Sequence, residues 1–430
     1  MLDFETIEFL TYILAGIGVV QYFRKTDEFV LLLVAFFYMT GIMRYQAVMS
    51  GQSEWVQVNY AINIFHMDNE LAIQALNLFF MGTFVFSICY IIFSEKQKRY
   101  RYLDNDEIFS QFLKSKQKLI VILYVVFLLI SSVTNRLSSS GGDLALGGGY
   151  IFLFGFAIGG MIILFFLLLK NLPKKQTFQR IIYLVLLVGA AVASYNPTSR
   201  FQMLSWMVAL IFIIVGRFNK VTKGICYVVG GVAAILLFMI AGNARKWETR
   251  NGNFETQVEN AQKRMQEASD QNMLDGFMMV LQVYPQYLDY GYGSEHFEIL
   301  LRPIPRAIWP EKPVGGYANK LHLNDKLMEE GRGTVGISQS IYGTFYGEGG
   351  TLGIVIFCVI YAVFFKVMFN RTKRYHSDMR YVLHGIIFAS TIPILRGGDL
   401  PGIVAFIGMS YWPVFLFLWM YRRYLRKRKL

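Results

Sequence analysis

Hydrophobic residues form long blocks along this chain, and short polar segments separate most of the blocks. Each block has about 17–25 residues, which is the length of helix that crosses a hydrocarbon core of about 30 Å. The pattern predicts an all-α polytopic membrane protein with about eleven transmembrane helices. We expect the spans near residues 5–22, 29–49, 70–93, 118–133, 150–169, 180–195, 201–216, 224–241, 338–368, 381–395 and 402–421. The block at 338–368 is too long for one upright span, so it should begin as a broken or re-entrant segment around residues 343–350.

The composition agrees with a membrane protein. Hydrophobic residues make up 54% of the 430 residues and charged residues 17%, with a mean hydropathy of +0.40. Because a soluble domain averages about 25% charged residues, an ordinary soluble protein is excluded. The net charge of +13 does not indicate a nucleic-acid partner here, since the basic residues cluster in short loops between spans. The cysteines all lie in apolar blocks, without the spacing of a metal site or a disulfide: Cys89, Cys226 and Cys358.

The distribution of Lys and Arg predicts the orientation of the spans. One set of alternate short loops, together with the C-terminal tail, holds the majority of the 42 basic residues, so we expect this set in the cytoplasm. The N-terminus is then outside and the C-terminus inside. Residues 1–241 would hold eight spans, residues 242–340 a large external loop, and residues 341–430 three spans and a basic tail resting on anionic membrane lipids.

Two parts of the external loop have distinct compositions. Residues 254–274 have the polar, helix-forming composition of a surface helix. Residues 275–287 are apolar enough to lie on the membrane surface or to cover a site.

Motifs for metal or nucleotide chemistry are missing from the sequence. There is no HExxH, no Walker motif and no metal-spaced Cys/His set. Asp104-Asn105-Asp106 matches the DxD of soluble glycosyltransferases, but it lies in a short loop, where a solvated turn is the simpler interpretation. We therefore expect metal-free chemistry without a cofactor. Acids of the first external loop, such as Asp68, are the weaker alternative.

Arginines gather at the external ends of the predicted spans and in the external loop, at Arg200, Arg302, Arg306 and Arg396. A guanidinium group meets phosphate oxygens two at a time and stays charged at any relevant pH. Several that converge could hold a diphosphate and stabilise its growing negative charge as it leaves. Alternatively, each one anchors to lipid headgroups or pairs with an acid, as Arg396 could with Asp399.

A group-transfer enzyme of this kind also needs a base. Glu348 lies among glycines at the start of an apolar span, and an acid at membrane depth is a functional-site hypothesis by default. It could also lie in the headgroup zone without a function, and His296 and His322 are the alternative bases. The external loop further carries aromatic side chains that could stack on sugar rings or form an interfacial belt, among them Tyr287, Tyr290 and Trp309.

These residues resemble a known family. Residues 302–313 resemble the P-x-P-R-x-x-W-P-x-K-P segment of Wzy-type polymerases of oligosaccharide repeat units. Residues 346–353 are similar to the glycine-rich start of the following span in that family, and residues 196–200 resemble its short arginine turn. The number of spans and the single large late loop also fit, so the likeness in layout covers most of the chain, although it is specific only over these short segments.

The resemblance implies a fold related to the GT-C membrane glycosyltransferases. It implies polymerisation of undecaprenyl-diphosphate-linked repeat units, as donor and acceptor, into an O-antigen, capsule or exopolysaccharide. The metal-independent site would face the periplasm or exterior of a bacterial inner membrane, and a chain-length regulator would be a further partner. The implied catalytic residues are Glu348, Arg302 and Arg306, and the implied substrate-binding residues are Arg200, Arg396, Trp309, Lys312, Tyr287 and Tyr290.

Two alternatives remain open at this point. An O-antigen-type ligase needs the same diphosphate clamp and the same layout. A flippase or transporter of lipid-linked oligosaccharide predicts polar residues along the middle of several spans, whereas the polar groups here collect at the external ends.

Overall fold

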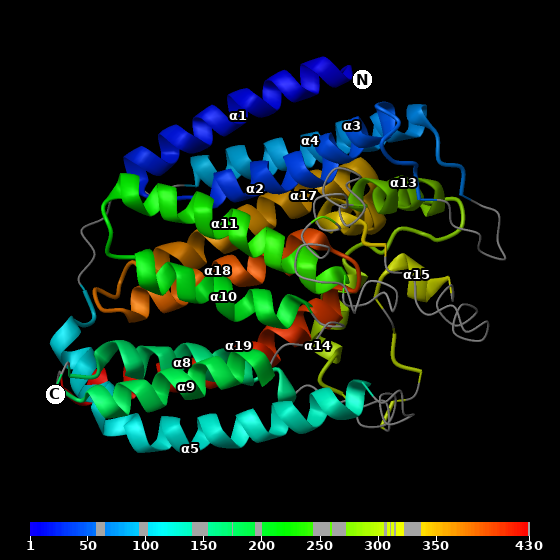
Figure 1. The fold of residues 1–430 in the computed structure, drawn as a ribbon. Helices are drawn as coiled ribbons and strands as arrows, with labels where there is room; N and C mark the ends of the chain where they lie inside the picture. Colours follow the sequence, from blue (N-terminus) through cyan, green and yellow to red (C-terminus); the bar gives the residue numbers. More distant parts are fainter. Residues whose placement is uncertain are drawn as a thin grey trace. The chain divides into compact units, whose positions relative to one another are not determined.

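A computed structural model describes residues 1–56, 65–93, 102–139, 154–173, 175–193, 200–243, 259, 272–304, 308–309, 311–313, 315–321 and 337–428. All regular structure in these ranges is helical, as the hydrophobic blocks predict (Figure 1). By length and composition, six of the described helices could cross a membrane. They are Phe4–Lys25, Phe29–Met49, Asn69–Ile92, Asp106–Thr134, Ser340–Thr372 and Leu400–Arg428.

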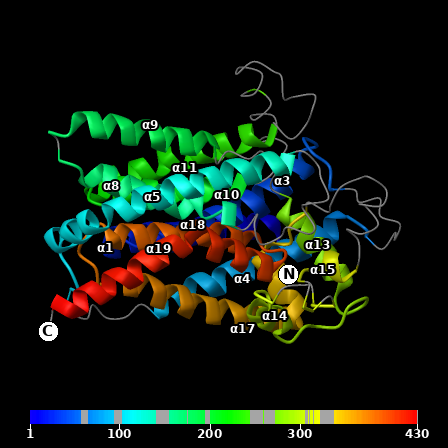
Figure 2. The ribbon, with the colours of Figure 1, turned by 90° about the horizontal axis from the view of Figure 1, so that it is seen from below.

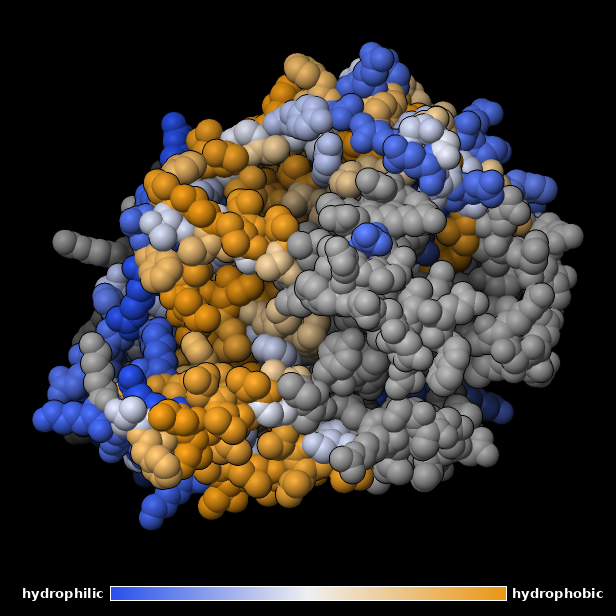
Figure 3. Space-filling model, viewed as in Figure 1, coloured by the Kyte–Doolittle hydropathy of each residue, from blue (hydrophilic) through white to orange (hydrophobic). Residues whose placement is uncertain are grey.

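The surface of these helices is that of a membrane-embedded protein. Large apolar side chains are exposed along the helix sides, for example Phe9, Ile122 and Val228. Figure 3 shows hydrophobic residues gathered over the helix sides, with hydrophilic residues at the helix ends on the left of the view. Such apolar faces suit contact with lipid chains rather than water. The polytopic all-α class is therefore confirmed, while the count of eleven spans and their orientation stay predictions.

The chain divides into two compact units that interleave in sequence. Unit 1 comprises residues 1–96, 258–367 and 391–405, and unit 2 comprises residues 97–257, 368–390 and 406–430. Three long helices contribute residues to both units: α17 (Ser340–Thr372), α18 (Met379–Arg396) and α19 (Leu400–Arg428).

Unit 1 begins with four helical segments, followed by α4 and, among the described residues, by three short helices of the later chain. They are α1 (Phe4–Lys25), α2 (Phe29–Phe37), the π-helix η1 (Tyr38–Ile42), α3 (Met43–Met49), α4 (Asn69–Ile92), α13 (Met273–Val283), α14 (Ser294–Leu301) and α15 (Tyr317–Lys320). Side-chain caps set two of the starts, because Asp3 accepts the Thr6 N–H at 2.8 Å and Asp68 accepts the Leu71 N–H at 2.7 Å. Asp68, the weaker catalytic alternative, is thus a helix cap.

Helix α13 lies in the core of unit 1, not on a surface. Residues 274–280 are all buried, and the helix packs against α4 and η1. Gly276 permits this packing, since a Cβ there would lie 2.3 Å from the Ser338 carbonyl oxygen. Of the two alternatives expected for residues 275–287, a position on the membrane surface is wrong for α13, while a cover over a site stays a prediction. The apolar composition reflects burial against other helices of the same unit.

Unit 2 is built around α8 (Ile158–Asn171), which is buried on all sides and packs against α5 (Asp106–Ser139), α9 (Thr177–Ala193) and α10 (Arg200–Val215) (Figures 1 and 2). Helix α11 (Lys220–Asn243) packs on α10. The rings of Tyr124 and Phe165 stack at 3.9 Å between α5 and α8, and the Tyr124 hydroxyl donates to the Leu186 carbonyl at 2.8 Å. A helix that is apolar all round is expected at such a central position.

The DxD-like segment belongs to the folded part of unit 2. Asp104 is buried and accepts hydrogen bonds from the His376 backbone N–H at 2.7 Å, the Tyr421 hydroxyl at 2.8 Å and the Ser377 hydroxyl. Asp106 pairs with Arg217. The solvated turn expected here is wrong for Asp104, whose carboxylate joins the polar groups of three chain segments.

Candidate functional site

Helix α17 is kinked near its start. Gly349 and Gly350 have non-helical backbone angles, and Gly350 has φ of 61°, in the left-handed region that favours glycine. Just before the kink, the Gly347 carbonyl accepts the Gly291 N–H at 2.9 Å. The break expected around residues 343–350 is confirmed, and it brings the chain before α14 against α17.

The carboxylate of Glu348 caps the N-terminus of α14. Its Oε1 accepts the Glu295 N–H at 2.9 Å, and its Oε2 accepts a short hydrogen bond from the Gly293 N–H. The first N–H groups of a helix lack partners within the helix and form the positive end of its dipole, so an anion is stabilised there. Glu348 is 3% exposed. A Cβ at Gly291 would lie 2.8 Å from Glu348 Oε2, which shows how tightly the carboxylate is enclosed.

His296 is the alternative base that the structure describes. Its ring stacks on Phe357 at 4.2 Å with an interplanar angle of 6°, and it also neighbours Phe345 and Tyr361. Its Nδ1 lies 3.6 Å from Glu348 Oε1, which is too long for a hydrogen bond. Neither ring nitrogen has a hydrogen-bond partner among the described residues. His322 lies outside the described residues.

Two further acids of α14 join this site. Glu295 is 4% exposed, its Oε1 accepts the Gly316 N–H, and burial raises its pKa from 4.5 to about 8, although Lys320 opposes the shift. Glu298 is half-buried, and burial raises its pKa as well, against the opposing charges of Lys320 and Arg302. Glu298 Oε2 is buried without a hydrogen-bond partner among the described residues. Sequence reasoning missed both acids, because they are ordinary helix-forming residues of a polar loop until the fold buries them.

Arg302 lies at the end of α14 and reaches the turn that follows α18. Its Nη2 is 3.4 Å from Asp399 Oδ2, and about a third of each side chain is exposed. Gly397 and Gly398 in this turn both have positive φ, and the Ser338 hydroxyl donates to the carbonyls of Arg396 and Gly397 at 3.0 and 2.9 Å. Asp399 therefore pairs with Arg302, and Arg302 lies against the turn that begins at Arg396.

Lys312 has a different environment from the one expected for a substrate contact. It is 8% exposed, and its Nζ donates to the carbonyls of Ile304 at 2.7 Å and Arg302 at 3.2 Å. These bonds join Lys312 to the chain at the end of α14. Trp309, in the same loop, is 37% exposed.

The two tyrosines expected at the site differ in exposure. Tyr290 stacks parallel to Tyr284 at 6.2 Å and contacts Tyr346 and Tyr292 edge-on. Its hydroxyl lies beside the kink of α17, 3.1 Å from where a Cβ of Gly350 would be. Tyr287 is 46% exposed. Tyr290 thus supports the kink, while Tyr287 presents its ring outward.

The remaining arginine candidates are not placed at this site. Arg306 lies outside the described residues. Arg200 begins α10 in unit 2, and its side chain also lies outside the description. Of the four arginines proposed to converge, the structure brings together Arg302 and the turn of Arg396.

Unit 1 also contains a buried ion pair that sequence reasoning missed. Arg44 of α3 donates from Nε and Nη2 to Asp275 of α13 at 2.8 Å each, and the two side chains are 2% and 0% exposed. Asp275 also accepts the Val56 N–H at 2.8 Å. These contacts join the N-terminal spans to α13, 231 residues apart in sequence.

No group of three or more His, Cys, Asp or Glu side chains suited to a metal ion occurs within the described part of the chain. Comparisons with protein-family models, with curated proteins and with solved structures found no match.

Proposed function

We propose that this protein is a membrane glycosyltransferase that polymerises undecaprenyl-diphosphate-linked repeat units into a surface polysaccharide. The proposal includes eleven spans, an N-terminus outside, a GT-C-like arrangement and a bacterial inner membrane. What supports it most is that a partly exposed guanidinium group lies beside acids of raised pKa at one short helix. Arg302 and Glu298 are four residues apart on α14, so they share one face of the helix.

The proposed reaction uses these groups in turn. A hydroxyl of the acceptor sugar attacks the anomeric carbon of the donor, forming the new C–O bond. The bond from that carbon to the diphosphate oxygen breaks, and undecaprenyl diphosphate leaves with the electron pair. Arg302 and Arg396 stabilise the leaving charge, with Arg306 and Arg200 as further candidates of the same type. The hydroxyl proton passes to a carboxylate.

Glu298 suits the role of base better than Glu348 does. Both oxygens of Glu348 accept backbone N–H groups, so in this proposal Glu348 positions α14. Glu298 is half-buried, its raised pKa makes the carboxylate more basic, and one of its oxygens lacks a hydrogen-bond partner among the described residues. Glu295 is nearly inaccessible, and its pKa of about 8 keeps it largely neutral at pH 7, which lowers the repulsion of an anionic substrate.

The buried charges of unit 1 support a transporter less well than they support a structural role. Lys366 of α17 donates to Asp27 at 2.8 Å, and the Tyr90 hydroxyl donates to the same carboxylate. Arg44 is likewise paired with Asp275. These charges are satisfied by one another, as expected of structural pairs rather than of a polar path.

The deciding experiment gives purified protein lipid-linked repeat units and separates the products on a gel. A ladder of products supports a polymerase. One block transferred to a different acceptor indicates a ligase, and the lack of any covalent product indicates a transporter. Arg302→Ala should abolish the ladder, and Arg302→Lys should restore only part of it, because lysine keeps the charge but loses the planar fork.

A second comparison identifies the base. Glu298→Gln should lower turnover by about 10²-fold and remove the rise of the rate with pH, because a glutamine cannot accept the proton. Glu311→Gln removes an exposed acid of the neighbouring loop and should change neither property. If Glu298→Gln retains the pH dependence and Glu348→Gln loses it, Glu348 is the base.

A further inference from the structure

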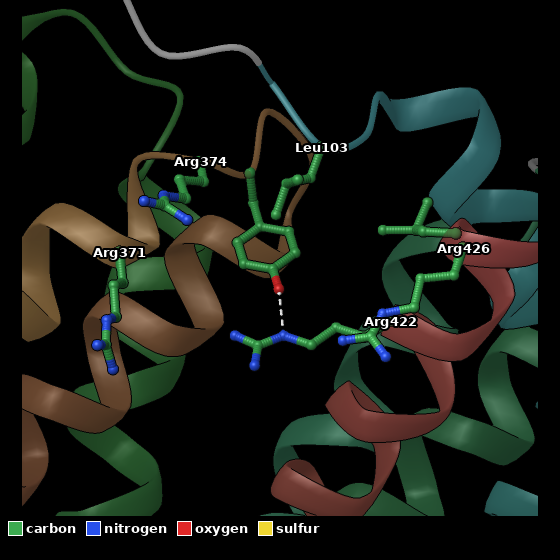
Figure 4. Close-up of a pocket in the computed structure, with 7 residues that line it drawn as sticks. Leu103, Arg371, Arg374, Arg422 and Arg426 are labelled. Atoms are coloured by element: carbon green, nitrogen blue, oxygen red, sulfur yellow. Dashed lines mark hydrogen bonds between the residues drawn. The ribbon is translucent and has the colours of Figure 1, made fainter. Parts of the chain in front are cut away.

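A cavity of about 410 Å³ in unit 2 is unusually rich in arginine. Arg371 comes from the last turn of α17, Arg374 from the turn before α18, and Arg422 and Arg426 from successive turns of α19 (Figure 4). The rest of the lining is Leu103, Tyr375 and Leu425. The cavity is thus a basic site with a partly apolar wall, within the size range of small-molecule sites.

One of the four guanidinium groups is held in place. The Arg422 Nε donates to the Tyr375 hydroxyl at 2.9 Å, the contact drawn as a dashed line in Figure 4. Tyr375 is 1% exposed, and the centre of its ring lies 6.5 Å from that of Tyr421, at an interplanar angle of 29°. Because the hydrogen bond uses Nε, the two terminal nitrogens of Arg422 remain oriented for a ligand.

The cavity has no acidic counterpart among the described residues. No described carboxylate lies within ion-pair distance of the four arginines. The acids of the surrounding segments are already engaged: Asp104 by Tyr421 and Ser377, and Asp378 by Lys170 and Arg217. All four arginine side chains are exposed, so an anion from the surroundings can reach them, and its charge would offset the repulsion among the four like charges.

A general excess of basic residues on one side of a membrane does not explain why these four arginines line one cavity. Arg423 and Lys427 belong to the same basic tail of α19, but they do not line the cavity. Arg423 instead lies over the ring of Trp419 at 3.9 Å. Arg423 and Lys427 add positive charge to the cytoplasmic side of the predicted topology just as well as the lining arginines do. The position of four arginines around one cavity therefore needs a further explanation.

We propose that this cavity binds the headgroup of an anionic phospholipid with two phosphates. The lining residues follow the apolar parts of α17 and α19, two helices long and apolar enough to cross a membrane, so the cavity lies where headgroups are expected. Each guanidinium group can hold two phosphate oxygens, so four of them exceed what one phosphate can use. Leu103, Tyr375 and Leu425 provide apolar contact for the glycerol backbone.

The test compares two double variants with the same change in charge and the same spacing on α19. Arg422→Gln/Arg426→Gln alters the cavity, and Arg423→Gln/Lys427→Gln is the matched control. Native mass spectrometry of the detergent-purified protein would titrate diphosphatidylglycerol, phosphatidylglycerol and phosphatidylcholine. We expect the unaltered protein to prefer diphosphatidylglycerol, the cavity variant to lose about tenfold or more in affinity for it, and the control to keep it.

Two further measurements separate lipid binding from misfolding and from binding of a soluble anion. Tyr375→Phe keeps all charges but releases Arg422, so it should weaken the lipid binding several-fold and serves if the double variant does not fold. Inorganic pyrophosphate added at the same concentration tests a soluble ligand. The proposal is overturned if pyrophosphate displaces the lipid at equal concentration, if the control loses as much affinity as the cavity variant, or if neither cavity variant changes the binding.

Discussion

Replacing Asp275 with Asn tests whether the buried pair with Arg44 holds the N-terminal spans to α13. The substitution removes the negative charge but keeps the volume of the side chain. Arg44 would keep its hydrogen bonds to Ser53 Oγ and the Glu54 carbonyl, both 2.7 Å, but its Nε and Nη2 would lose a charged partner. Leaving one charge of a buried pair uncompensated costs about 3–5 kcal/mol.

The geometry supports the upper part of that range. The two side chains are 2% and 0% exposed, so water cannot replace the lost contact. The Val56 N–H also donates to Asp275 at 2.8 Å, so the carboxylate serves three donors. Asparagine keeps one of the two acceptor oxygens, and a buried donor that loses its acceptor costs about 1–3 kcal/mol more. Replacing both charged residues by apolar ones of similar size should be less costly than Asp275→Asn alone, because no unpaired charge remains.

Reversible unfolding in mixed micelles would measure these differences. Trp55 is a convenient fluorescent reporter, since the Arg44 guanidinium carbon lies 5.7 Å from the centre of its ring. Asp106→Asn is the control, because its pair with Arg217 is about half exposed and should contribute at most about 1 kcal/mol. A free-energy change for Asp275→Asn as small as that of the control would refute a structural role for the buried pair.

Three further predictions concern single positions. Glu295 has a pKa of about 8 in the folded protein and 4.5 ordinarily. Between these pH values the folded state binds one proton more than the unfolded state. The free energy of unfolding therefore falls as the pH rises through this window, by up to about 1.4 kcal/mol per pH unit. Glu295→Gln should remove this slope in thermal unfolding from pH 5 to 8, and an unchanged slope would contradict the assignment. Gly350→Ala should lower the unfolding temperature, because φ at this position is 61°, in the region that side chains rarely adopt. Gly349→Ala is the control and should be tolerated, because φ there is 177° and a Cβ would meet open space. Equal effects of the two substitutions would argue against backbone strain at the kink. Gly82→Ala should lower the unfolding temperature as well, since its Cβ would lie 2.4 Å from the Tyr342 ring, and an unchanged temperature would show that the ring moves freely.

The hydrophobic pattern was sufficient for the helices and for the break in α17. Blocks of membrane length and the glycines at 349 and 350 are local features of the sequence, so their consequences could be predicted. The burial of α13 could not be predicted, because an amphipathic, largely apolar segment suits a membrane surface and a buried core equally well. Asp275 points to the buried alternative only when its partner Arg44 is known, and nothing local links the two positions.

At the candidate site too, the sequence predicted local features but not contacts between residues distant in the chain. Arginine at the ends of spans was recognisable from sequence, and Arg302 does lie against the turn of Arg396 and Asp399. Lys312, which was expected to bind substrate in the same segment, donates its hydrogen bonds to backbone carbonyls instead. The acids of α14 were missed because their chemistry depends on burial by residues distant in the chain, and burial is what raises the pKa of Glu298.

Under the proposed function, the pair of Arg302 and Asp399 has a consequence for how a diphosphate enters. Both side chains are about one third exposed, and a contact of 3.4 Å at such exposure is a weak ion pair. A diphosphate that links a lipid to a sugar carries two negative charges, one on each phosphate, whereas a carboxylate carries one, so the diphosphate can displace Asp399 from the guanidinium group. Asp399 would then hold Arg302 in position before binding and yield it to the substrate. The cost of breaking the pair is small, which leaves most of the interaction of Arg302 for the diphosphate and for the charge that grows on it during transfer.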